Sequence, residues 1–198
     1  MKIAILSHGD NRMDRWKKIS FENKKKYCDN YGYDFIGSDK VYDDRPPQWS
    51  KLLMVREYLP SYDWVMWNDP DTLIMNTEIK LEEFIDNDFD FIAAKFDYIN
   101  MGVFFVKNSA IGLKIINDIY NQDQYIGLAG NDESAAKHLL GTKEYIDIVR
   151  ENIKLINNAS FNKMPDKFQL GDFIIHFPGH YKDYKYFKKL SQGIKYHE

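Results

Sequence analysis

The distribution of apolar residues along the chain predicts alternating strands and helices. Short runs that are mostly apolar are typical of buried strands, and they fall at residues 2–7, 33–38, 63–67, 88–96, 101–109 and 172–179. Between these runs, apolar residues recur at the spacing of one helix face. This spacing predicts helices over residues 11–31, 49–59, 109–120 and 131–140. Gly32 is the expected C-cap of the first helix, and Asn131 or Asp132 is the expected N-cap of the last.

The alternation of strands and helices predicts the fold class. We expect a single domain over residues 1–198, built as an α/β/α sandwich with a mostly parallel, mixed sheet. In such sheets, ligands bind outside the carboxyl ends of the strands. The polar segments "HGDN", "NDPD" and "HFPG" each follow a predicted strand. They are therefore expected to meet.

Composition narrows the class of protein. The formal net charge of −3 is too close to neutral for a general nucleic-acid partner. Cys28 is the only cysteine, so neither an internal disulfide nor a cysteine-based zinc site can form. The sequence has no apolar run near 18 residues, so we expect no membrane span and a soluble, cytoplasmic protein.

Two aspartates, Asp69 and Asp71, end the strand within "YDWVMWNDPDTLIMN". Residues two apart on an extended segment project to the same side, so both carboxylates can face one point. Such an oxygen-rich site suits Mg²⁺ or Mn²⁺ shared with a substrate phosphate. The alternative is a simple turn, because Asn-Asp-Pro-Asp is also turn chemistry.

Three further stretches carry candidate chemistry, each with an ordinary structural alternative. His176 ends an apolar strand, where it can complete a carboxylate site and favour Mn²⁺, or can be a hydrogen-bonded core histidine. Lys182 can meet a phosphate, or can be one of many solvated lysines. Asp132 and Glu133 start a helix, where they can face a cleft or only favour the helix dipole. Gly102 can permit close approach of a ligand, or can mark a bulge.

Taken together, these motifs resemble the metal-dependent glycosyltransferases of the GT-A fold. The resemblance is to the retaining family that includes yeast α-mannosyl- and α-galactosyltransferases and plant xyloglucan xylosyltransferases. "WSK", "YLPSYDWVMWNDPDTLIMN", "NMGVFFVKNS", "NDESAAKHLL" and "IIHFPG" carry it in the family's order, between about Lys24 and Lys182. "HFPGHYK" is also similar to the His-x-x-Gly-x-x-Lys end of glycogenin-like transferases.

The resemblance implies roles for named residues. Asp69, Asp71 and His176 would hold Mn²⁺ (or Mg²⁺) against the diphosphate of a UDP- or GDP-sugar. The other implied residues surround the donor. Ser7, His8 and Lys51 would lie near the nucleotide, Gly179 and Lys182 near the diphosphate, Asn100 and Gly102 along the donor sugar, and Asp132 and Glu133 at the reacting carbon.

Two departures from the family pattern stand out. Glu133 replaces the family's Gln and Asn131 its Asp, which implies a stronger negative field or a different sugar preference. The eukaryotic relatives also have a membrane anchor and stem. Neither feature is recognisable in this sequence, so we expect a compact catalytic core.

The predicted function is retaining transfer of a sugar from the nucleotide donor to a carbohydrate hydroxyl. One alternative is a module that binds a nucleotide-sugar or glycan without turnover. The other is a phosphatase of the haloacid dehalogenase type, for which Thr72 stands one place too early.

Overall fold

A computed structural model describes residues 1–196 and shows a six-stranded mixed sheet. The strand order is β2-β1-β3-β6-β5-β7, and the β1–β2, β1–β3 and β5–β7 pairs are parallel while the two pairs of β6 are antiparallel. The predicted mostly parallel, mixed sheet is therefore confirmed. The bounds are β1 Ile3–His8, β2 Asp34–Ser38, β3 Trp64–Asn68, β5 Phe91–Lys95, β6 Ile99–Lys107 and β7 Ile153–Asn157.

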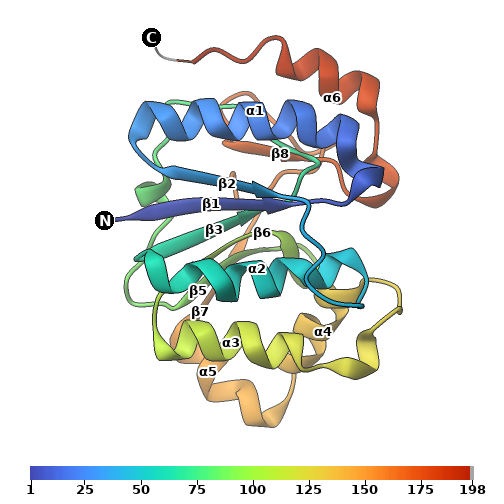
Figure 1. The fold of residues 1–198 in the computed structure, drawn as a ribbon. Coiled ribbons are helices and arrows are strands. Elements are labelled where there is room, and N and C mark those ends of the chain that lie inside the picture. Colours follow the sequence, from blue (N-terminus) through green and yellow to red (C-terminus); the bar gives the residue numbers. More distant parts are fainter. Residues whose placement is uncertain (197–198) are drawn as a thin grey trace.

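Helices cover both faces of this sheet, as Figure 1 shows. One face carries α1 (Asp14–Tyr31), with α6 (Tyr184–Ser191) beyond it. The other face carries α2 (Ser50–Tyr58), α3 (Ala110–Tyr120) and α4 (Asn131–Leu140), and α5 (Ile146–Asn152) lies beside them. No helix within residues 1–196 combines the length and apolarity that a membrane crossing requires.

Alternation along the strands builds a core on each side of the sheet. In β3, Val65 and Trp67 pack toward α2 and α3, whereas Trp64 and Met66 pack toward α1. Because side chains alternate between faces, the apolar runs of β1, β3, β5 and β6 supply both cores at once. These runs are the strands that the sequence predicts best.

β4 (Thr72–Ile74) and β8 (Ile174–His176) form a separate two-stranded sheet. They pair antiparallel, with Thr72 opposite His176. The sequence predicts the late strand but not its partner, because three residues are too few to show a period. β7 was not predicted either.

The predicted side-chain cap of α4 is wrong. The N-cap is Gly130, whose φ of 82° is left-handed, and it makes no side-chain cap hydrogen bond. Glycine takes this conformation without steric cost. Asp132 is thereby free to turn inward, and its side chain is almost fully buried. At the other predicted cap, Gly32 ends α1 in the left-handed region, as expected.

Candidate active site

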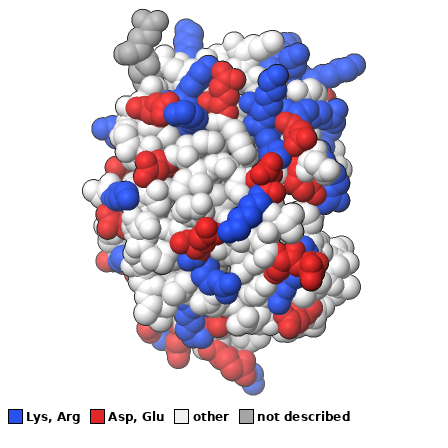
Figure 2. Space-filling model, in the orientation of Figure 1, with Lys and Arg blue, Asp and Glu red and all other residues white. Residues whose placement is uncertain are grey.

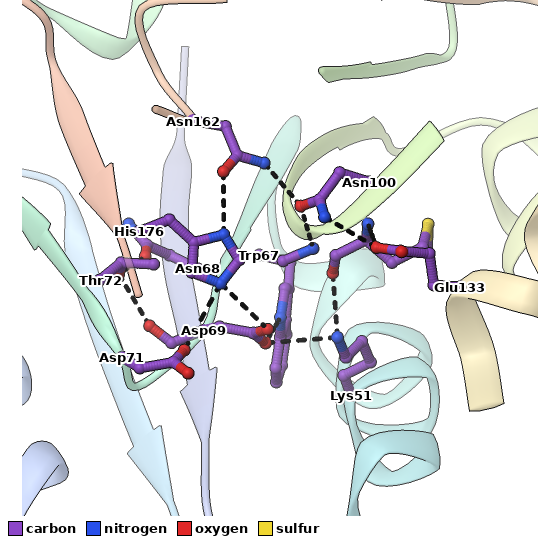
Figure 3. Close-up of polar contacts among 12 residues, drawn as sticks. Lys51, Trp67, Asn68, Asp69, Asp71, Thr72, Asn100, Glu133, Asn162 and His176 are labelled. Atoms are coloured by element: carbon purple, nitrogen blue, oxygen red, sulfur yellow. Dashed lines mark hydrogen bonds and ion pairs between the residues drawn. The ribbon is translucent and has the colours of Figure 1, made fainter. Parts of the chain in front are cut away.

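The two aspartates lie on the loop between β3 and β4. Two hydrogen bonds from the flanking strands restrain this loop. The indole N–H of Trp67 donates to Asp69 Oδ1 over 2.7 Å, and the Thr72 hydroxyl donates to the Asp69 carbonyl over 2.7 Å. The Thr72 hydroxyl also contacts Asn68 Oδ1. These contacts hold the loop in one shape, so the carboxylates face a common point (Figure 3).

His176 completes a cluster with the two aspartates. Its Nε2 lies 3.5 Å from Asp71 Oδ1 and 4.0 Å from Asp69 Oδ2. One ligand atom from each of the three residues falls within 4.8 Å of the others. The pairing of β4 with β8 causes this convergence, because it sets His176 opposite Thr72, directly after Asp71.

The donor set fits a divalent cation. His176 is 2% exposed, and its Nε2 has no hydrogen-bond partner among the described residues although two carboxylates face it. An unpaired buried polar atom of this kind is costly unless something binds it. Burial alone would raise the pKa of Asp71, but the nearby imidazole of His176 and ammonium of Lys182 outweigh it and lower that pKa. The two carboxylates can bind either Mg²⁺ or Mn²⁺, and the imidazole nitrogen favours Mn²⁺.

Gly102 makes room for the imidazole. A Cβ at this position would lie 2.9 Å from both ring nitrogens of His176, closer than real Cβ atoms come. The pairing of β5 with β6 also shifts register opposite this segment, between Ala93 and Lys95. The close approach predicted at Gly102 is therefore to His176. Its place along the donor sugar stays a prediction.

Lys24 lies beneath the aspartate loop and was not predicted as a site residue. It is fully buried, and its ammonium donates to the Asp69 carbonyl over 3.1 Å and contacts Ser20 Oγ. Burial lowers the pKa of Lys24 to about 7, although Asp71 and Asp69 raise it in part. Its spacing of three residues from the apolar Tyr27 places it on the buried face of α1, and this spacing could have indicated that Lys24 is buried.

Lys51 links two of the predicted acids. Its Nζ lies 3.3 Å from Asp69 Oδ1 and 3.1 Å from Asp132 Oδ2, and it donates to the Met101 carbonyl. Burial would lower the pKa of Lys51, but the two carboxylates outweigh it, so the lysine stays charged. Burial raises the pKa of Asp132 to about 6 despite this cation, since Asp69 and Glu133 also repel its charge. The ammonium of Lys51 therefore offsets the negative charge of both Asp69 and Asp132.

Glu133, on α4, contacts the start of β6. Its Oε2 accepts from Asn100 Nδ2 at 2.7 Å and from the Met101 N–H at 3.2 Å. Burial raises the pKa of Glu133, and the Met101 N–H and Lys51 oppose that shift. Asn162 lies between Asn100 and His176 and hydrogen-bonds to both; no motif in the sequence points to it.

Two cavities flank the cluster. The first, called the basic cavity here, has a volume of about 400 Å³. Its charged lining consists of Asp10, Arg12, Arg15, Lys51, Asp69, Asp71 and Lys182. Lys182 Nζ lies 3.5 Å from Asp71 Oδ2. Figure 2 shows basic side chains gathered toward the upper right, around α6 and the start of α1, where this cavity has its arginines.

The second cavity, called the aromatic cavity here, lies on the Glu133 side and measures about 630 Å³. Its lining includes Phe96, Tyr98, Asn100, Glu133, Gly179 and Tyr181. Phe96 and Tyr98 are 37% and 42% exposed, so both rings are accessible from this cavity.

The remaining predicted residues fall at different depths. His8 lines the basic cavity, where its Nε2 lies 2.9 Å from the Lys40 carbonyl oxygen. Gly179 lines the aromatic cavity with a φ of 51°. Ser7 is fully buried, and its hydroxyl has no partner among the described residues. Its nucleotide contact stays a prediction.

The fold is that of the GT-A glycosyltransferases. A glycosyltransferase involved in glycosylation of the major capsid of PBCV-1 superposes with a TM-score of 0.76 over 97% of this chain and 100% of its own, at 16% identity. The galactosyltransferase LgtC, solved with donor and acceptor sugar analogues, gives a TM-score of 0.58 over 98% of this chain and 97% of its own, at 13% identity.

Sequence comparison confirms the resemblance drawn from the motifs. Residues 3–88 match the galactosyl transferase GMA12/MNN10 family. An uncharacterised alpha-1,2-galactosyltransferase of Schizosaccharomyces pombe is 24% identical over 208 residues, which cover 80% of this chain and 54% of that protein. The chain spans about half the length of such curated relatives.

Proposed function

We propose that the protein is a metal-dependent retaining glycosyltransferase, which moves a sugar from a UDP- or GDP-sugar to a carbohydrate hydroxyl. One observation carries the proposal: Asp69, Asp71 and the unpaired Nε2 of His176 converge beside a cavity lined by basic side chains. A diphosphate suits such a site, because phosphate oxygens bind both a divalent cation and the N–H groups of lysine and arginine. The likeness to glycosyltransferases gives the phosphatase alternative no support.

The residues of the basic cavity would bind the donor. Asp69, Asp71 and His176 would hold Mn²⁺ or Mg²⁺, which supplies positive charge to the departing diphosphate. Lys182 lies close enough to Asp71 to add a second positive charge at the same place. His8 and Lys51 line the same cavity, on the side of β1 and α2.

The sugar would lie toward Asn100, Asp132 and Glu133. Retention by attack on the same face needs no protein nucleophile, because the departing phosphate can take the acceptor proton. Glu133 or Asp132 as a nucleophile is the alternative. Glu133 is held by two N–H donors, so its carboxylate is oriented and its negative charge can stabilise positive charge at the anomeric carbon.

The aromatic cavity would receive the acceptor. It is lined by Glu133 and Asn100, whereas the basic cavity is lined by Asp69 and Asp71 of the metal cluster. Exposed aromatic rings such as Phe96 and Tyr98 stack against the apolar faces of sugars. The cytoplasmic location stays a prediction that cell fractionation would check.

Thermal unfolding against a panel of UDP- and GDP-sugars tests the donor site. A true donor at 100 times its dissociation constant should stabilise the protein by about 2.7 kcal/mol. The gain should require Mn²⁺ and disappear with a chelator. Release of free UDP or GDP from the stabilising donor would then separate an enzyme from a module that only binds.

Replacing Tyr98 with alanine tests the acceptor side. Loss of one stacking ring should raise the KM for the acceptor roughly 10-fold. Hydrolysis of the donor without acceptor should be unchanged, because Tyr98 lies outside the basic cavity. Tyr98→Phe keeps the ring and is the matched control, with an expected KM near wild type. Equal KM values for Tyr98→Ala and wild type would place the acceptor elsewhere.

A further inference from the structure

A chain of three hydrogen bonds joins His176 to Glu133. His176 Nδ1 lies 2.9 Å from Asn162 Oδ1, and Asn162 Nδ2 lies 2.8 Å from Asn100 Oδ1. Asn100 Nδ2 in turn lies 2.7 Å from Glu133 Oε2. Figure 3 shows the two amides in line between the imidazole and the carboxylate.

One backbone group fixes the direction of every bond in this chain. The N–H of Gly102 can only donate, and it points at Asn100 Oδ1 over 3.0 Å. That atom is therefore the oxygen of Asn100, so Asn162 meets it with its NH₂ group. Asn162 then presents its own oxygen to His176, and Nδ1 must carry the proton.

Burial keeps water from competing with these bonds. Asn162 is fully buried, and His176 and Asn100 are 2% and 8% exposed. All three bonds donate in the same sense, from the imidazole toward the carboxylate. Aligned hydrogen bonds polarise one another in a medium of low dielectric constant.

We propose that Asn162 is a positioning residue, and that the Asn162–Asn100 relay couples the cation at His176 to the negative charge of Glu133. The inference rests on the metal site of the proposed function. A cation on Nε2 makes Nδ1–H a stronger donor, and the amides pass this polarisation to Glu133. In return, the carboxylate makes Nε2 a better ligand, as outer-shell partners of metal-bound histidines do.

The relay links the two cavities. Glu133 lines the aromatic cavity, whereas Asp69 and Asp71 line the basic cavity. Loading of the cation on one side would therefore strengthen the hydrogen bond that holds the Glu133 carboxylate in place on the other, where the sugar and acceptor would meet. By reciprocity, removal of the Glu133 charge should weaken binding of the cation at His176.

Binding of Mn²⁺ to the purified protein, measured by electron paramagnetic resonance of the free ion, tests this role without turnover. Asn162→Ala should weaken Mn²⁺ binding by roughly 10- to 100-fold. Asn162→Asp keeps an acceptor for His176 but loses the donor to Asn100, so its Mn²⁺ affinity should stay near wild type. Asn157→Asp and Asn157→Ala, at an exposed position on β7, are the matched controls.

A double-mutant cycle separates the relay from a direct effect of charge. Glu133→Gln should weaken Mn²⁺ binding about 5-fold in the wild-type background, and not at all in Asn162→Asp. An equal effect in both backgrounds would overturn the relay, because charge acting through space ignores Asn162. Unfolding without metal confirms that each variant folds. If wild type itself binds no Mn²⁺, the metal site fails; if all variants bind alike, only the relay fails.

Discussion

Replacing Asp71 with alanine is expected to lower the rate of sugar transfer by roughly 10³-fold, the scale on which removal of one group that stabilises developing charge acts. Asp71 is 6% exposed, faces His176 and pairs with Lys182, so its loss removes a cation ligand and a partner of the lysine together. Initial rates with donor and acceptor measure the effect. Titration with Mn²⁺ should show the loss of binding in parallel.

Asp29→Ala is the control for this experiment. Asp29 is an exposed acid on α1 that pairs only with Lys25 in the described structure, so both transfer and Mn²⁺ binding should stay at wild-type values. An Asp71→Ala protein that transfers sugar at the wild-type rate would remove the cation from the mechanism.

Neutralising Asp132 is expected to stabilise the metal-free protein at pH 7.5. Burial raises the pKa of this carboxyl from 3.8 to about 6, so the folded state holds the proton more tightly than the unfolded state. The stabilising contribution is complete below pH 3.8 and is lost as the pH rises to about 6. Asp132→Asn should therefore unfold with a free energy up to about 3 kcal/mol higher than wild type at pH 7.5.

The pH dependence supplies the control for Asp132. At pH 4 the variant and the wild type should be nearly equal in stability, and only the wild type should lose stability between pH 4 and 6 on account of this group. Urea unfolding with a chelator at each pH measures both. A variant less stable than wild type at pH 7.5 would show that the ion pair with Lys51 outweighs the cost of burial.

The sequence predicts those parts of the fold in which a period repeats over several residues. The apolar runs of β1, β3 and β6 and the helical spacing of α1 and α2 survive in the structure because each buries a complete face. The rule that ligands bind outside the carboxyl ends of strands predicts that Asp69, Asp71 and His176 can meet, but the β4–β8 pairing that brings them together is not predicted.

The rest depends on contacts that no local pattern encodes. Asn162 stands in an irregular segment, and the path between β7 and β8 alone brings it to the imidazole. Lys24 stands among other lysines, and only its burial against the aspartate loop shows its part. Gly130 replaces the expected polar cap because the loop before α4 turns through the left-handed region.

The pairing of β4 with β8 also determines when cation binding becomes possible during synthesis. Asp69 and Asp71 emerge from the ribosome long before His176, and the imidazole reaches them only when β8 adds to β4. A nascent chain that ends before β8 holds two carboxylates without the nitrogen ligand. Tight binding of the proposed cation would therefore require a chain that has been made and folded through β8, the last strand of the described residues.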